Sequence, residues 1–135
     1  MTTTDSYSSQ EVRAIVNNAA GSYQYHTISM FPGYPVLTDS VKALCEAAGC
    51  YWLMDIIASH QCKSKVGAAM FQIWELAYVC KSKSDYWLVT MKEDSNMPVM
   101  VSQKLFYSDF PLPEGVKLYM INDGRNRVIL LPGDY

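Results

Sequence analysis

The segment LTDSVKALCEAAGCYWLMDIIASH, residues 37–60, carries the clearest helical pattern of the chain, and the other elements are interpreted around it. Apolar residues in its first half recur at steps of three and four, which is the periodicity of an amphipathic helix. Thr38 or Asp39 is suited to the N-cap, because a short side-chain oxygen can accept a hydrogen bond from an N–H group of the first turn. Gly49 interrupts the pattern before a second apolar stripe, so we predict two short helices or one kinked helix.

The pattern changes from helical to alternating after this segment. A helix from Ser9 to about Asn18 is expected before it, and residues 63–67 are expected to form a polar connection. Runs of aromatic and β-branched residues then predict strands over Ala69–Cys80, Tyr86–Lys92, Val99–Leu105, Val116–Ile121 and Arg127–Leu131. Polar turns are expected between them, the first at residues 81–85. This order predicts an α+β fold, in which N-terminal helices pack on one face of a four- to five-stranded antiparallel sheet.

The length and composition indicate one domain. A chain of 135 residues is long enough to bury a single core, and 50% apolar with 18% charged residues is a composition typical of globular proteins. We expect residues 1–8 to form a flexible tail and residues 9–135 to form one α+β domain.

The charge balance disfavours two classes of partner. A formal net charge of −2 gives no electrostatic footprint for a phosphate backbone, so we expect no nucleic-acid binding. No apolar run is long enough to span a bilayer, and the polar start of the chain lacks the pattern of a secretory signal. We therefore expect a soluble cytoplasmic protein that does not associate with membranes.

The four cysteines give no evidence of a metal site or a disulfide framework. Cys45, Cys50, Cys62 and Cys80 are not spaced as Cys-x-x-Cys pairs, and no histidine completes a zinc pattern with them. We expect reduced cysteines that serve as small apolar residues, with no bound metal and no cofactor.

Residues 22–36 combine aromatic side chains with two prolines, which predicts an irregular loop with a short extended piece near residues 25–28. Large rigid side chains dominate protein interfaces, so an exposed set of them would form an anchor surface for a partner protein. Closure of the core explains most of the same residues equally well. The candidate binding residues are Tyr23, Tyr25, Phe31, Tyr34, Trp74 and Trp87.

Three residues are candidates for acid–base chemistry. Asp55 lies within the most apolar helical turn, where burial would raise the pKa of a carboxyl group; a hydrogen bond to a neighbouring loop is the structural alternative. His26 lies in the aromatic loop and would approach Asp39 or Asp55 through tertiary folding. Such a pair is the best catalytic constellation of the chain, although no serine, cysteine or metal partner stands at a recognisable spacing.

Several sequence blocks together resemble a known family. They are LTDSVK at residues 37–42, AGCYWLMDIIASHQ at 48–61, FQIW at 71–74, DFPL at 109–112 and ILLPGDY at 129–135. They resemble an uncharacterised family of small proteins from bacteria, phages and plasmids. Ser40 stands where a glycine is expected, and Gly133-Asp134 replaces a Ser-Glu pair. The resemblance implies a setting among mobile genetic elements and assigns no reaction, catalytic residue or cofactor.

Three hypotheses about function follow. The first is a non-enzymatic accessory factor that binds another protein, such as an inhibitor of a host defence complex of the anti-CRISPR kind. The second is a small enzyme that uses His26 with Asp39 or Asp55. The third is a self-associating module, a homodimer in which an edge strand such as Arg127–Leu131 pairs across a two-fold axis.

Overall fold

The central segment folds into two helices, as its pattern predicts. Helix α2 spans Asp39–Ala48 and helix α3 spans Tyr51–His60. Gly49 ends α2 in a left-handed conformation with a φ of 65°, and its N–H donates to the carbonyl of Cys45. Glycine adopts this conformation without the strain of a Cβ atom, which explains why the helix stops there.

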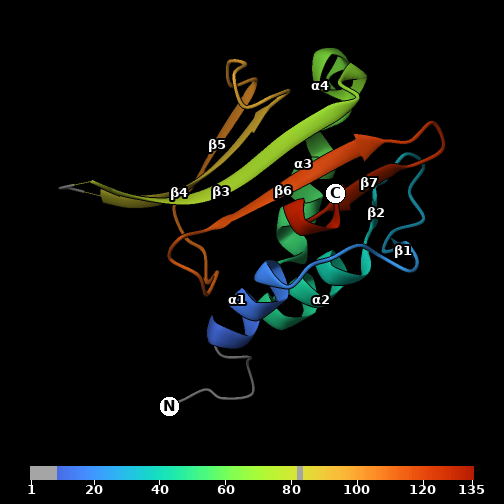
Figure 1. Cartoon of the computed structure of the whole chain (residues 1–135). Helices are drawn as coiled ribbons and strands as arrows, with labels where there is room; N and C mark the ends of the chain where they lie inside the picture. Colours follow the sequence, from blue (N-terminus) through green and yellow to red (C-terminus); the bar gives the residue numbers. More distant parts are fainter. Residues whose placement is uncertain (1–8, 82–83) are drawn as a thin grey trace.

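The computed structural model describes residues 9–81 and 84–135, which form a mixed α/β fold (Figure 1). Helix α1 precedes the central pair and helix α4 follows it; their bounds are Ser9–Asn17 and Ser64–Ala68. The strands are β1 His26–Thr27, β2 Val36–Leu37, β3 Phe71–Lys81, β4 Ser84–Lys92, β5 Val101–Leu105, β6 Val116–Asn122 and β7 Arg127–Leu130, followed by the 3-10 turn η1 Pro132–Asp134.

The strands form a seven-stranded sheet in the order β1-β2-β7-β6-β3-β4-β5. The predicted meander is present, because β3 pairs with β4 and β4 pairs with β5, both antiparallel. The sheet differs from the expected four or five antiparallel strands in two ways. Two further strands of two residues each join one edge, and β2 runs parallel to β7, which makes the sheet mixed.

Alternate residues of the sheet and the apolar faces of the helices form the core. Gln72, Trp74 and Leu76 of β3 are buried, together with Leu53 and Ile57 of α3. Figure 1 shows β3 and β6 crossing in front of α3, with α1 and α2 below them. The side chain of Gln72 reaches this layer and exchanges two hydrogen bonds with Gln61, at 2.9 and 3.0 Å.

Helix α1 is tied to the loop that precedes β6. The guanidinium of Arg13 donates two hydrogen bonds to the carboxylate of Glu114, at 2.5 and 3.0 Å. This pairing lowers the pKa of Glu114 to about 2. The hydroxyl of Ser9 also donates to the carbonyl of Pro111, at 3.2 Å. The start of α1 is therefore held against a segment about one hundred residues later in the chain.

Asp134 joins the last turn to the beginning of α2. Its carboxylate accepts hydrogen bonds from the Thr38 hydroxyl at 2.8 Å and the Gly21 N–H at 2.9 Å, and also from the Ser40 hydroxyl. Thr38 is the N-cap residue but makes no capping bond with its side chain, so the expectation of a hydroxyl cap is wrong. The side chain is turned to Asp134 instead.

Two other expectations about the elements are wrong, and two concern residues outside the described ranges. Residues 63–67 are mostly helical rather than a simple connection, because α4 begins at Ser64. Arg127–Leu131 is not an edge strand, since β7 lies between β2 and β6, so the prediction that this segment is a free edge is wrong. The expected tail, residues 1–8, lies outside the described residues. The expected turn at residues 81–85 contains positions 82 and 83, which also lie outside them.

Candidate functional site

The aromatic loop between α1 and β2 is anchored on the first turn of α2. The backbone N–H of Tyr23 donates to the Asp39 carboxylate at 2.9 Å. In return, the backbone N–H of Asp39 donates to the Ser22 hydroxyl at 2.9 Å, and this hydroxyl donates to the carbonyl of Gln24 at 2.6 Å. Asp39 therefore holds the beginning of the loop through both its backbone and its side chain.

The structure brings His26 and Asp39 together, as one of the two predicted pairs. Nε2 of His26, on β1, lies 2.6 Å from Oδ1 of Asp39. The pKa of Asp39 lies below its usual value, mainly because the carboxylate accepts the Tyr23 N–H and secondly because it binds His26. Asp39 also borders a cavity between α1 and α2, which Ala19, Tyr23 and Ala43 help to line.

Asp55 lies on α3 and binds Tyr34 rather than His26. The Tyr34 hydroxyl donates to the Asp55 carboxylate. The pKa of Tyr34 is raised, first by burial and then by this hydrogen bond, so the phenol remains a donor at neutral pH. Asp55 itself is exposed, which contradicts the picture of a buried carboxyl and agrees with the structural alternative of a bond to a loop. The pairing of Asp55 with His26 is not observed.

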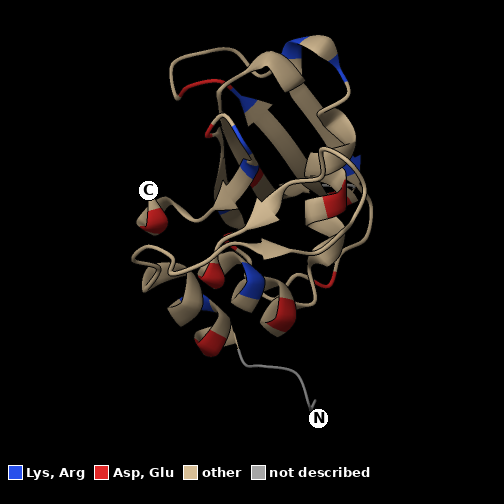
Figure 2. Cartoon of the chain, turned by 90° about the vertical axis from the view of Figure 1, so that its right-hand side faces the viewer, with Lys and Arg blue, Asp and Glu red and all other residues tan. Residues whose placement is uncertain are grey.

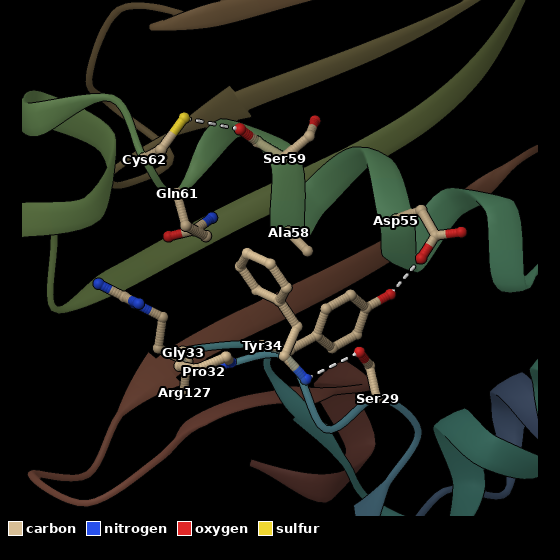
Figure 3. Close-up of a pocket in the computed structure, with 11 residues that line it drawn as sticks. Ser29, Pro32, Gly33, Tyr34, Asp55, Ala58, Ser59, Gln61, Cys62 and Arg127 are labelled. Carbon is tan, nitrogen blue, oxygen red and sulfur yellow. Dashed lines mark hydrogen bonds between the residues drawn. The ribbon is translucent and has the colours of Figure 1, made fainter.

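A cavity of about 450 Å³ lies beside this bond, between the loop and α3. Figure 3 shows the Tyr34 hydroxyl directed at Asp55, the Arg127 guanidinium at the other end, and Ala58 between them. Phe31, Pro32 and Gly33 supply the loop wall. The facing wall consists of Ala58 and Ser59 in α3 and of Gln61 and Cys62 just after it. The cavity thus combines apolar walls with a carboxylate at one end and a guanidinium at the other.

Arg127 was not among the residues that the sequence pattern indicated for a site. One arginine at the beginning of a strand has no local signature, and β7 reaches the cavity only because it pairs with β2, which follows the aromatic loop. Nη2 of Arg127 donates to the carbonyl of Gly67 at 3.4 Å. The contact that brings this residue to the site is therefore tertiary.

The candidate aromatic residues divide into exposed and buried groups. Tyr23 is fully exposed, and Tyr25 and Phe31 are 48% and 74% exposed. Tyr34 is half-buried in the cavity wall. Trp74 and Trp87 are 1% and 8% exposed and belong to the core, so they are not part of a surface. Trp87 packs edge-on against Phe110, and the Trp74 indole donates to Gln72 at 2.8 Å.

The four cysteines are free, two of them buried and two exposed. Among the described residues, no group of three or more histidine, cysteine, aspartate or glutamate side chains could hold a metal ion. Within the same ranges, 9–81 and 84–135, no helix is long and apolar enough to cross a membrane.

The fold is expected to lose stability in acid, because protonation of the Asp39 carboxylate removes the stabilisation that this group provides. Its pKa is lower in the folded chain than in the unfolded one, so the stabilisation is present above about pH 4 and is lost as the pH falls through the folded value. Urea unfolding at about pH 6 and about pH 3 measures this loss for the wild type and for Asp39→Asn, which does not titrate. The wild type should lose more stability than the variant, and equal losses would contradict the assignment.

Comparison with known proteins gives a family and no function. No curated protein and no solved structure matches the chain. A family model matches residues 10–135, which include all the elements of the site. The chain therefore belongs to a family of unknown function, DUF6876.

Proposed function

We propose that the chain acts by binding another protein through the exposed side chains of its aromatic loop. The observation that carries the proposal is the exposure of Tyr23, Tyr25, Met30 and Phe31 within one short segment. Aromatic side chains and methionine are enriched in the centres of protein interfaces, where they bury large apolar areas. Scattered single apolar residues would need no such explanation, but a group on one loop does.

The anchoring of the loop supports this role. Asp39 fixes the backbone at Tyr23, and Asp55 fixes the side chain of Tyr34, so both ends of the loop are attached to the helices. A loop that is already ordered loses less conformational entropy on binding than a flexible one. The exposed residues are therefore presented from a largely preformed backbone.

The charge distribution supports an apolar rather than an electrostatic basis for binding. Figure 2 shows the side of the molecule that lies on the right in Figure 1, and acidic and basic residues are interspersed over its helices and strands. The net charge of −2 is small for a chain of this length. Steering by a large single-sign surface is therefore not part of the proposal.

A more specific part of the proposal concerns the identity of the partner protein. The resemblance to proteins of bacteria, phages and plasmids supports an accessory factor of a mobile genetic element that works in the cytoplasm. In this role the chain would inhibit a host defence complex by occupying one of its surfaces. The partner would be a protein and no enzymatic activity is required.

A matched pair of variants tests the binding surface. Tyr23→Ala/Tyr25→Ala/Phe31→Ala removes the exposed aromatic side chains of the loop. The control, Phe106→Ala/Tyr107→Ala, removes two other exposed aromatic side chains, beyond β5 at the opposite edge of the sheet. Each tagged protein is used for affinity purification from a bacterial lysate. A partner that binds through the loop should be retained by the wild type and the control, and reduced to less than about one-tenth by the loop variant.

Two results would count against this proposal. Recovery of no stoichiometric partner by the wild type would remove its basis. Equal recovery by the loop variant and the wild type would place binding elsewhere on the surface. Light scattering on the eluted species gives the stoichiometry in either case.

The His26–Asp39 pair favours a second candidate function, a small hydrolytic or proton-transfer enzyme. A carboxylate bound to one ring nitrogen orients a histidine so that the other nitrogen can act as a base. Among the described residues, no serine or cysteine side chain forms a hydrogen bond with His26, so a substrate or water would supply the reacting group. His26→Gln should abolish any such activity while leaving loop-dependent binding unchanged.

A further inference from the structure

Arg127 has unused hydrogen-bond donors at the edge of an apolar cavity. A guanidinium carries five N–H donors. Arg127 uses one of them on the Gly67 carbonyl, at a long distance of 3.4 Å. Within residues 9–81 and 84–135, no carboxylate forms an ion pair with it; the three ion pairs there involve Arg13, His26 and Lys42. A half-buried guanidinium without an acidic partner is a strong site for an anion.

Two glycines lie beside this guanidinium. A Cβ atom on Gly67 would lie 2.3 Å from the Gln61 carbonyl oxygen and 3.5 Å from Nη2 of Arg127. A Cβ atom on Gly33, whose φ is 81°, would lie 3.7 Å from Nη1. The backbone of α4 therefore lies beside Nη2 of the guanidinium, and that of the loop lies beside Nη1.

From these contacts we infer that the cavity is a binding site for a small organic carboxylate with a flat apolar body, held by Arg127. This inference goes beyond the proposed function, because it concerns a ligand within the cavity rather than the exposed face of the loop. A carboxylate matches the fork of a guanidinium with two parallel hydrogen bonds. Phe31, Pro32 and Ala58 offer apolar contacts to the body, and a volume of about 450 Å³ lies in the range of small-molecule pockets.

The walls of this cavity are fixed before a ligand enters. Gln61 belongs to a buried network in which its amide donates to the Ile57 carbonyl at 3.1 Å and to Gln72 at 2.9 Å. Tyr34 is held by its bond to Asp55. A preformed site binds a small ligand with little cost in ordering its side chains.

The opposite end of the cavity defines the charge of the ligand. Asp55 lines it and lies across from Arg127 in Figure 3. A second anionic group, or a phosphate dianion, would be repelled by the Asp55 carboxylate and not balanced by one arginine. A hydrogen-bond donor or a cation at that end of the ligand would be attracted. The preferred ligand therefore carries one carboxylate, and an amino group at its far end strengthens binding.

The test is a titration of the full chain with benzoate, 4-(aminomethyl)benzoate, benzamide and phenyl phosphate. Two-dimensional amide NMR spectra are recorded at each ligand concentration. Benzoate and 4-(aminomethyl)benzoate should shift the amides of Gly33, Gly67 and Arg127 with saturation, and the second should bind more tightly. Benzamide and phenyl phosphate should bind at least about tenfold more weakly than benzoate.

Two variants with the same change in net charge distinguish a specific effect of the cavity on benzoate binding from a general effect of charge. Arg127→Gln should weaken benzoate binding about tenfold or more, whereas Arg125→Gln, in the exposed turn nearby, should leave it unchanged. Arg127→Lys keeps the charge but loses the fork, and should bind with intermediate affinity. Asp55→Asn should remove the preference for 4-(aminomethyl)benzoate and should not weaken benzoate.

The amide spectra of the variants also report whether each one is folded. If Arg127→Gln disturbs the fold, the comparison of Arg127→Lys with the wild type still tests the guanidinium. The inference is overturned if no probe gives saturable shifts at the cavity, if benzamide binds as well as benzoate, or if Arg125→Gln and Arg127→Gln have equal effects. None of these results bears on the loop-dependent recovery of a partner protein, so the two proposals fail separately.

Discussion

Replacement of Gln72 by leucine is expected to lower the free energy of unfolding by about 4 kcal/mol, because it leaves several buried polar groups without partners. The side chain is completely buried. It accepts the Trp74 indole N–H at 2.8 Å and donates to the Val66 carbonyl at 2.8 Å, besides its two bonds with Gln61. Leucine has a similar size, so the loss comes from unsatisfied groups rather than from an empty cavity.

Urea unfolding compares Gln72→Leu with Gln24→Leu, which makes the same change at an exposed position of the loop. The control should change the free energy of unfolding by less than about 0.5 kcal/mol. The indole N–H resonance of Trp74 should move in the Gln72 variant, since it loses its acceptor. A loss below about 1 kcal/mol would mean that the network contributes little to stability.

The same substitution should also weaken the carboxylate site. Gln61 lines the cavity, and its side chain is positioned by Gln72. When this support is lost, the wall beside Arg127 becomes free to move. Benzoate binding should therefore weaken in any Gln72→Leu protein that remains folded, although residue 72 does not line the cavity.

Replacement of Asp134 by alanine has the second-largest expected effect, a loss of about 3 kcal/mol in the free energy of unfolding, because hydrogen bonds to a charged acceptor are stronger than neutral ones. The variant removes the acceptor for the Thr38 and Ser40 hydroxyls and for the Gly21 N–H. A carboxylate near the first turn of a helix is also favoured by the helix dipole, and α2 loses this interaction.

The matched control is Asp109→Ala, an exposed aspartate beyond β5, whose effect should be below about 0.5 kcal/mol. Amide hydrogen exchange identifies the region affected by Asp134→Ala. Exchange should accelerate at Gly21 and Tyr23, which lie where the aromatic loop begins, and remain slow in the β3–β4 hairpin. Equal stability of the two variants would show that the last turn is not fixed by this carboxylate.

The sequence predicts the parts of the fold that have a long, regular pattern. The two central helices and the strands β3 to β7 are recognisable because each runs over enough residues for its periodicity to be visible. Strands β1 and β2 have two residues each, and the second follows a loop with two prolines. Such short strands exist because a neighbouring strand pairs with them, and this neighbour is far away in the sequence.

The candidate site was predictable only in part, because its residues meet through contacts between distant segments of the chain. Residue types suggested that His26 would meet Asp39 or Asp55, and the structure places it in contact with Asp39. The sequence left open whether each aromatic residue is in the core or on the surface, since alternation along a strand does not show which face is covered. Trp74 and Trp87 lie on the covered face. Arg127 was missed because its approach to the loop depends on the parallel pairing of β2 with β7.

This parallel pairing also determines when the aromatic loop can take its final form during protein synthesis. Val36 pairs with Val128 and Leu37 with Ile129, across about ninety residues. Strands β3 and β4 are neighbours in the sequence, so their pairing can form early, whereas contacts across long separations form slowly. On the ribosome, a growing chain would therefore expose the loop aromatics without their final support until residues 127–134 have emerged. The binding surface would therefore mature together with the last strand.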